Sequence, residues 1–195
     1  LTATDQRFYK QKLEDVFGQY ETKLSLKEAM EKNIVANARV FRLETNLDLS
    51  KVRFNGKDYV NADLEKSIRV TSRNDLIGDV LNKYFNSNEF KDKQGIIFCV
   101  NIKHAQEISK VLNKLNISAV SLSSTTKGID KIMQDFKDKK IRFLCSCNMI
   151  NEGWDYPEIE ILVMARPTMS KVLYQQQIGR GLRKANNKEC VYVVD

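Results

Sequence analysis

The sequence predicts an α/β protein in which helices cover both faces of a parallel sheet. Short runs of β-branched and aliphatic residues recur along the C-terminal two-thirds of the 195-residue chain. Segments with helical apolar spacing separate these runs, and strands joined by helices form parallel sheets. Hydrophobic residues make up 42% of the chain, so a sizeable core can be buried.

The expected strands are short apolar segments. Gly95–Val100 is the first of them, and its continuous apolar run suits a strand buried on both faces. Further strands are expected at residues 117–122, 141–145, 159–165 and 191–194. Usual strand counts predict a mainly parallel sheet of six or seven strands, formed by residues from about 73 onward.

The expected helices carry apolar residues three or four positions apart. Hydroxyl groups in Ser123–Thr126 are expected to cap one helix, and Ser170 to cap another that starts near Lys171. The apolar rows that predict helices are Leu76, Val80 and Tyr84; Ala105, Ile108, Leu112 and Leu115; and Ile129, Ile132, Met133 and Phe136.

The first seventy residues have a different pattern. A helical apolar row spans residues 9–17 and ends at Gly18, and Ser25–Glu28 matches a capping box that opens a second helix. Val35–Asn46 is expected to be extended, and Asn55-Gly56 signals a turn. We therefore expect two helices and a connecting segment outside the sheet.

Charge and cysteine content limit the classes of function. The formal net charge is +7, which favours an acidic partner such as a nucleic acid, although scattered lysines on a solvated surface explain it equally well. The four cysteines form no C-x-x-C pair and His104 is the single histidine, so no metal site is expected. Reduced, buried thiols are typical of a cytoplasmic protein.

Membrane association is not expected, because no apolar run approaches the roughly 18 residues that a spanning helix needs. The chain opens on Leu1 rather than methionine, which suggests a fragment of a longer protein.

The stretch from Leu173 to Lys184 carries the strongest candidate chemistry. On a helix, Gln176, Arg180 and Arg183 form one polar row, opposite an apolar row of Tyr174, Ile178 and Leu182. Arginine remains charged and binds phosphate oxygens through two parallel hydrogen bonds. The pair could present positive charge to a polyphosphate, although solvated arginines on a surface helix are an equally good interpretation.

A second candidate stretch, Asn148–Pro157, follows an apolar strand. It is therefore expected at the carboxyl end of the sheet, where open α/β sheets bind ligands. Gly153 permits a tight turn, and Asp155 can accept hydrogen bonds from a hydroxyl group or an arginine. Taken alone, the stretch could equally be a turn around a buried tryptophan.

Together, N-E-G-W-D at 151–155 and Q-x-x-G-R-x-x-R at 176–183 resemble motifs V and VI of superfamily 2 helicases. Residues 96–100 are similar to motif IV, and Leu1–Thr4 to motif III, which closes the first motor domain. Arg166–Thr168 and Ser170 resemble a segment of the motor subunits of type I and type III restriction enzymes and related DEAD/DEAH-type helicases. The resemblance implies a RecA-like domain of the P-loop NTPase superfamily. Residues 1–72 would then be the tail of the first motor domain with its connecting segment, and residues 73–195 the helicase C-terminal domain.

The resemblance also assigns roles to individual residues. Arg180 and Arg183 match the arginine fingers that reach the γ-phosphate of ATP, and Gln176 the residue that couples nucleotide to domain closure. Gly153 and Asp155 match motif V, with the aspartate near the ribose. Cys147 falls where many relatives have a threonine that contacts a nucleic-acid phosphate, and Asn101, Ser123 and Ser124 are candidates for further backbone contacts at the ends of strands.

Departures from the family pattern narrow the resemblance. Gln177 and Leu182 replace a common arginine and glycine, which favours the restriction-motor branch over DEAD-box RNA helicases. Asp5 stands where relatives usually have proline. The G-x-x-x-x-G-K-[ST] and D-E-x-[DH] motifs, whose residues hold ATP phosphates and Mg²⁺, are absent from the sequence. The resemblance therefore implies that an N-terminal motor domain of the same protein binds most of the ATP and Mg²⁺, and that this fragment alone is inactive.

Two classes of function remain open at this point. The first is the second motor domain of an ATP-dependent helicase or translocase that acts on nucleic acid, with DNA favoured over RNA and restriction-system subunits as potential partners. The second is a non-catalytic nucleic-acid-binding or scaffold module with the same fold. Both arginines of motif VI are present, which favours the motor.

Overall fold

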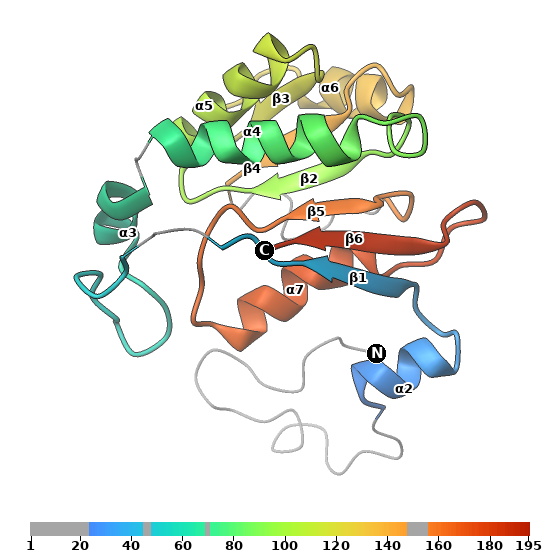
Figure 1. Cartoon of the computed structure of the whole chain (residues 1–195), viewed down its shortest axis with the longest axis horizontal. Helices are drawn as coiled ribbons and strands as arrows, with labels where there is room; N and C mark the ends of the chain where they lie inside the picture. Colours follow the sequence, from blue (N-terminus) through green and yellow to red (C-terminus); the bar gives the residue numbers. More distant parts are fainter. Residues whose placement is uncertain (1–23, 45–47, 69–70, 148–155) are drawn as a thin grey trace.

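The computed structural model describes residues 24–44, 48–68, 71–147 and 156–195. Six strands form one sheet in the order β1-β6-β5-β2-β4-β3, and every pairing in it is parallel (Figure 1). The predicted α/β architecture with a parallel sheet is confirmed. The strands are β1 (Asn37–Phe41), β2 (Gly95–Phe98), β3 (Ala119–Leu122), β4 (Phe143–Ser146), β5 (Ile161–Val163) and β6 (Cys190–Val194).

The strands alternate with helices along most of the described chain. The helices are α2 (Leu26–Glu31), α3 (Asn61–Ile68), α4 (Thr71–Phe85), α5 (Ile102–Lys114), α6 (Ile129–Lys137) and α7 (Lys171–Gly181). α2 opens with the expected capping box between Ser25 and Glu28, and Ser170 caps α7 by accepting a hydrogen bond from the Leu173 amide. The expected helix at residues 9–17 lies outside the described residues.

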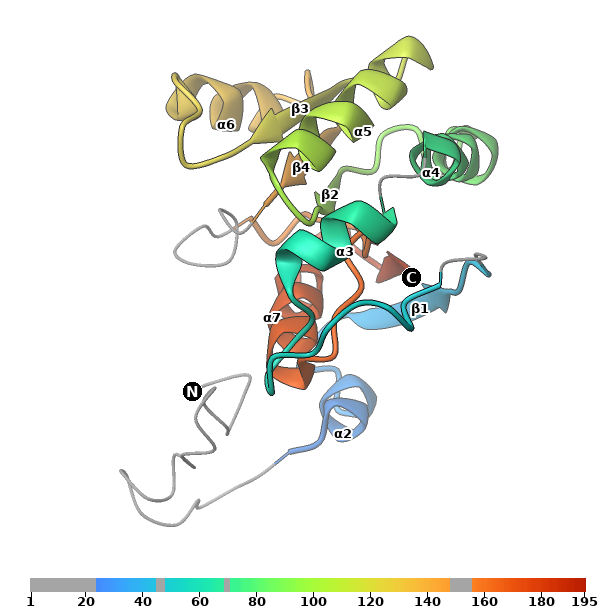
Figure 2. The ribbon, with the colours of Figure 1, turned by 90° about the vertical axis from the view of Figure 1, so that its left-hand side faces the viewer.

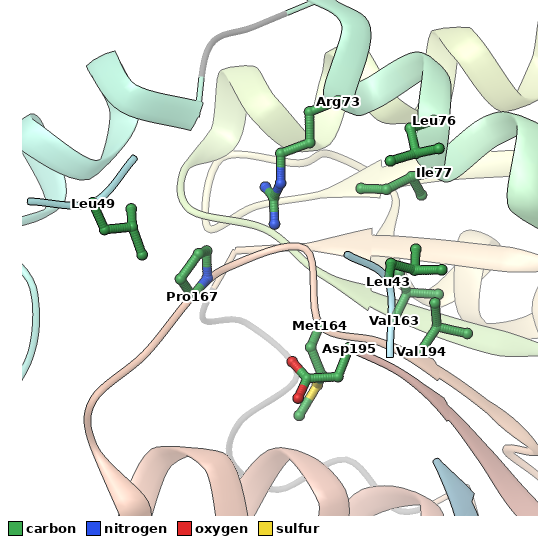
Figure 3. A pocket seen from close by; sticks show the side chains of 10 residues that line it. All are labelled: Leu43, Leu49, Arg73, Leu76, Ile77, Val163, Met164, Pro167, Val194 and Asp195. Carbon is green, nitrogen blue, oxygen red and sulfur yellow. The ribbon is translucent and has the colours of Figure 1, made fainter. Parts of the chain in front are cut away.

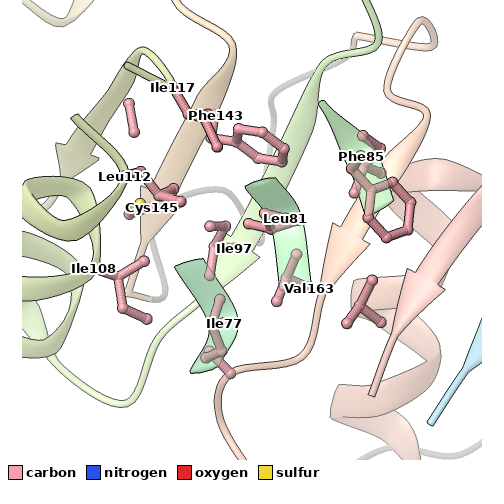
Figure 4. Close-up of a cluster of buried hydrophobic side chains, with 14 of the residues drawn as sticks. Ile77, Leu81, Phe85, Ile97, Ile108, Leu112, Ile117, Phe143, Cys145 and Val163 are labelled. Carbon is pink, nitrogen blue, oxygen red and sulfur yellow. The ribbon is translucent and has the colours of Figure 1, made fainter. Parts of the chain in front are cut away.

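The core consists of two layers, one on each face of the sheet. α4 and α5 cover one face, where Ile97, Phe143 and Val163 point toward them (Figure 4). α6 and α7 cover the other face, where they pack against residues such as Ile96 and Leu162 of the strands. Neighbouring residues of a strand thus supply opposite layers, as the period of two requires, and this is why the strands are apolar throughout.

β1 corrects the sequence-based expectation for the sheet. Residues 37–41 pair along β6, so the sheet is not built only from residue 73 onward. Most of the strand is exposed, with Val40 and Phe41 about half accessible. The expected extended segment at 35–46 therefore includes a true edge strand.

Two local expectations also need correction. The hydroxyl groups of Ser123, Thr125 and Thr126 bond to one another instead of capping α6, whose N-cap is Gly128 in the left-handed conformation (φ 68°). α7 ends at Gly181, so Arg183 lies beyond the helix rather than on its surface. Gly181, the last residue of the helix, packs closely against the sheet: a Cβ at this position would lie 2.5 Å from the Val191 side chain.

A strap, defined here as residues 48–68, connects the β1 side of the chain to α4 and packs at the carboxyl ends of the strands (Figure 2). Its turn at Asn55-Gly56 is the one expected, with Gly56 at φ 89°. Val52, Tyr59 and Leu64 of the strap pack against Val100, just after β2. None of the helices in the described ranges is long and apolar enough to cross a membrane.

Candidate functional site

The candidate residues fall into two groups, at opposite ends of the strands. Asn101, Ser123, Ser124 and Cys147 follow the carboxyl ends of three adjacent strands, β2, β3 and β4. α7 begins at the carboxyl edge with Lys171 and runs antiparallel to the strands, so its last turn lies toward their amino ends (Figure 1). Arg180 and Arg183 are therefore separated from the other four residues. We call those four, Asn101, Ser123, Ser124 and Cys147, the carboxyl-edge row.

The carboxyl-edge row is ordered by the ends of the strands. The Asn101 side chain caps α5 by accepting a hydrogen bond from the His104 amide at 2.8 Å. Cys147 Sγ donates to the Val100 carbonyl at 3.4 Å, which joins β4 to the end of β2. Ser124 is exposed, whereas Ser123 is 6% exposed and bonded to Thr125 and Thr126. Of the two serines, Ser124 is thus the more accessible to a ligand.

Burial shifts the pKa of two groups here, Cys147 in the row and His104 next to it. It raises the pKa of the half-buried Cys147 thiol, while the charge of Arg166 acts in the opposite direction. It also lowers the pKa of His104 to about 4, with a further contribution from Arg73. His104 Nδ1 accepts from the Val100 amide at 3.3 Å, so the neutral ring supports the start of α5.

The two predicted rows differ in burial as expected, although Leu182 and Arg183 lie just past the end of α7. Tyr174, Ile178 and Leu182 pack into the core, as expected. Gln176 and Arg180 are half-buried, and Arg183 is exposed just past the helix. Neither arginine belongs to the buried core.

Gln177 stands where the family pattern commonly has arginine. Its side chain is 4% exposed and points into the protein, and Oε1 accepts no hydrogen bond from the part of the chain that the structure describes. The position that carries arginine in many relatives is therefore an interior position in this chain. Two residues further on, a Cβ at Gly179 would meet no atom of the described residues within 4 Å, apart from its chain neighbours and the backbone of its own helix.

Lys188 is a functional candidate that sequence reasoning did not identify. Its ammonium group donates to the carbonyl oxygen of Pro157 at 2.8 Å and to that of Arg183 at 3.0 Å, and it also bonds to the Gly181 carbonyl. Burial lowers the pKa of Lys188 to about 8, and the nearby acids Glu158 and Glu160 act in the opposite direction. No sequence signal distinguishes this lysine from solvated ones.

The strap is anchored to the segment that leads into α7. Asp58 accepts hydrogen bonds from Arg166 at 2.8 Å, from the Thr168 hydroxyl at 2.9 Å and from the Met169 amide at 2.8 Å. Arg166 also donates to Asn61 at 3.1 Å. The Arg166–Thr168 stretch noted in the sequence is thus held by a partner more than one hundred residues away.

A cavity of about 250 Å³ lies next to this anchor, at the carboxyl ends of β5 and β6 (Figure 3). Arg73 and Asp195 bring charge to its otherwise apolar wall, and Arg73 donates to the Ala165 carbonyl at 2.7 Å. The remaining lining residues are Leu43, Leu49, Leu76, Ile77, Val163, Met164, Pro167 and Val194.

The predicted motif V residues Gly153 and Asp155 lie outside the described residues, as does the motif III stretch Leu1–Thr4 with Asp5. The residues that flank motif V are described: Cys147 lies at the carboxyl edge, and Pro157 before the amino end of β5. Within the described ranges, no three His, Cys, Asp or Glu side chains cluster closely enough to hold a metal ion.

The model of the helicase conserved C-terminal domain family matches residues 74–185, and the chain belongs to this family. The match covers the strands from β2 to β5 and all of α7. The predicted relationship to superfamily 2 helicases is confirmed.

Curated relatives support the same class. The chain is 29% identical over 198 residues to a putative ATP-dependent helicase of Saccharomyces cerevisiae, covering all of this chain and 28% of that protein. It is 26% identical over 211 residues to an endonuclease subunit of a type I restriction enzyme from Escherichia coli, covering 94% of this chain and 25% of that subunit. The chain thus spans about a quarter of each relative.

Solved structures show the same fold. A fragment of a putative HsdR subunit of a type I restriction enzyme from Vibrio vulnificus superposes with a TM-score of 0.78 at 23% identity, covering 98% of this chain and 38% of that chain. A DNA-bound type ISP restriction-modification enzyme gives a TM-score of 0.61 at 16% identity, covering 93% of this chain and 13% of that chain. The chain is thus a superfamily 2 helicase C-terminal domain related to restriction-enzyme motor subunits.

Proposed function

We propose that this domain is the second motor domain of an ATP-dependent DNA helicase or translocase. In this proposal, Arg180 and Arg183 act on ATP bound mainly by an N-terminal motor domain of the same protein. The observation that carries the proposal is the position of both arginines at the far end of α7, outside the core of a helicase C-terminal domain.

The arginines fit a nucleotide phosphate chemically. Two guanidinium groups at one end of a helix can donate several hydrogen bonds to phosphate oxygens and stabilise negative charge that develops during phosphoryl transfer. Gln176, one turn before Arg180, would help couple the nucleotide to closure of the domains, and Gly153 and Asp155 would contact it through motif V. ATP with Mg²⁺ would supply the phosphoryl group and the metal charge.

The carboxyl-edge row is proposed to contact the nucleic-acid backbone. Asn101, Ser124 and Cys147 bring amide, hydroxyl and thiol groups to adjacent strand ends, and Ser123 orders the loop that carries Ser124. Such groups bind phosphate without reading sequence. The net charge of +7 agrees with a polyanionic partner.

DNA is favoured over RNA by the relatives rather than by the geometry. A curated relative is a subunit of a type I restriction enzyme, and a structural neighbour with the same fold is a DNA-bound restriction-modification enzyme. The partners proposed on this basis are DNA, the N-terminal motor domain and restriction-system subunits. The four cysteines are free thiols, which agrees with a cytoplasmic location.

The test of the proposal is alanine substitution of each arginine in the protein that carries both motor domains. Removing an arginine finger lowers turnover by roughly 10³–10⁵-fold. Both side chains lie outside the core, so the melting temperature should change little, in line with a surface substitution of less than about 0.5 kcal/mol. Lysine should not restore activity, because it lacks the planar pair of donors. Near-normal kcat in either alanine variant would remove that arginine from the catalytic role.

The same experiment separates the motor from the scaffold alternative. A non-catalytic module would bind nucleic acid with a steep salt dependence but without ATP turnover in any variant. The isolated 195-residue chain should show no turnover above background, because its sequence lacks the phosphate-binding and Mg²⁺-binding motifs. Turnover by the purified chain that rises with nucleic acid would contradict the proposed division of the site.

A further inference from the structure

We propose that Lys188 is a positioning residue that holds the arginine-bearing end of α7 in place. It does so by binding backbone carbonyl groups at that end of the helix and at Pro157. The inference rests on the proposed role of Arg183. It adds a residue that touches neither ATP nor nucleic acid in the proposal but fixes the group that does.

The geometry is a three-way junction of backbone segments. Lys188 Nζ donates to three carbonyl oxygens: that of Gly181, the last residue of α7; that of Arg183, two residues past the helix; and that of Pro157, which follows the motif V stretch. A protonated ammonium group has three N–H donors, so these three acceptors use its full capacity. The end of α7 and the chain at Pro157 are thus bonded to one atom.

This arrangement satisfies a need that the helix creates. The last carbonyl groups of an α-helix have no partner within the helix, and a cation near them is also favoured by the helix dipole. Gly181 is the last residue of α7, and its carbonyl is among these groups. Lys188 approaches from the chain that leads into β6, which fixes the end of α7 relative to the sheet.

Arg183 depends on this junction more than Arg180 does. Arg180 lies inside the hydrogen-bonded helix, whereas Arg183 lies two residues past its end. The bond from Lys188 to the Arg183 carbonyl therefore replaces the support that a helix would give. Catalytic groups displaced by about 1 Å can lose roughly 100-fold in rate.

The surroundings of Lys188 make its charge sensitive to pH. Glu158, Glu160 and the Cys190 thiol are the titratable groups that act on it electrostatically, and Lys93 pairs with Glu160 at 2.6 Å. Burial lowers the pKa of Lys188 to about 8. A neutral amine has two N–H donors rather than three, so deprotonation leaves one of the three carbonyls without its partner.

The experiment compares Lys188→Met with Lys93→Met in the protein that carries both motor domains. Methionine preserves an unbranched side chain but removes all donors. Lys93 is the matched control, because it is also a partly buried lysine but its ammonium group bonds to Glu160 rather than to the end of α7. For Lys188→Met we expect kcat to fall about 10-fold or more while the KM for ATP changes less than about 3-fold. The control should keep kcat within about 3-fold.

A pH series separates positioning from a loss of structure. In the parent protein, kcat should decline as the pH rises from 7 to 9.5, and in Lys188→Met this decline should be absent. Equal kcat in parent and folded Lys188→Met would overturn the inference, as would an unchanged decline in the variant or an equal loss in the control. If Lys188→Met does not fold, Lys188→Gln replaces it, and a flat parent profile across this range overturns the inference by itself. Normal kcat in Arg183→Ala would instead reject the catalytic role proposed for Arg183, on which this inference rests.

Discussion

Acidification should destabilise this domain through one buried histidine. His104 is 6% exposed, and its ring lies between the Val100 amide and Asn74 Oδ1, which is 3.0 Å from Nε2. Since Nδ1 accepts the Val100 N–H, the proton of the neutral ring belongs on Nε2 and is donated to Asn74. A second proton on Nδ1 would remove the acceptor and place a charge beside Arg73.

The magnitude follows from the two pKa values. Burial lowers the pKa of His104 from 6.5 to about 4 in the folded state, so the unfolded chain binds more protons between these values. Stability is therefore fully present above pH 6.5 and is lost as the pH falls toward 4. A shift of this size corresponds to about 3 kcal/mol in total, of which about 2 kcal/mol is lost by pH 5.

The assay is chemical denaturation of the 195-residue chain and of His104→Gln between pH 4 and 8. Carboxylates also titrate in this range, so the quantity of interest is the difference in unfolding free energy between the two proteins at each pH. Glutamine does not titrate, so the difference should be constant above pH 7 and shift by about 2 kcal/mol against the parent by pH 5. A difference that does not change with pH would refute a depressed pKa for His104.

Two matched pairs of substitutions test the packing that positions the site. Gly181→Ala should destabilise the chain by about 1–3 kcal/mol, because its Cβ would meet Val191 at 2.5 Å. Gly179→Ala should instead stabilise α7 by up to about 1 kcal/mol. Melting temperatures of the two variants that shift in the same direction would contradict this. Asp58→Ala should cost about 3–5 kcal/mol by urea denaturation, because it leaves the buried Arg166 charge short of its partner. Asp63→Ala should cost less than about 1 kcal/mol, because its partner Arg53 is exposed and stays solvated. Equal losses in the second pair would show that burial of the Arg166 pair does not matter.

The sheet was predictable because its interior strands carry their own signal. Gly95–Phe98 and Cys190–Val194 are buried along their whole length, and such strands appear in the sequence as uninterrupted apolar runs. β1 lacks that signal, because an edge strand with one neighbour is largely exposed and can carry Asn37 and Arg39. Its pairing depends on β6, which lies about 150 residues later in the chain.

The candidate site was predictable only where local spacing defines it. Arg180 follows the N-cap residue Ser170 by a fixed number of helical residues, so the helical pattern places Arg180 correctly on α7. Helical spacing continues past Gly181 in the sequence and therefore predicted Arg183 on the helix, whereas the helix ends at Gly181. Lys188 and Asp58 act through backbone carbonyls and a distant arginine, and neither kind of partner leaves a pattern in a single sequence.

The two ends of α7 indicate how the proposed sites could communicate. At its start, the segment before Ser170 is bonded to Asp58, and the strap that carries Asp58 packs on Val100, beside the carboxyl-edge row. At its end, Lys188 bonds α7 to Pro157. Each end of one rigid helix is thus fixed to a segment that borders a proposed ligand site. Because packed elements tend to move as units, we expect a displacement of the arginines toward ATP to carry α7 and its two anchoring segments with it. In the proposed motor, closure on ATP would therefore shift the carboxyl-edge row together with the arginines, and this is the coupling that a translocase requires.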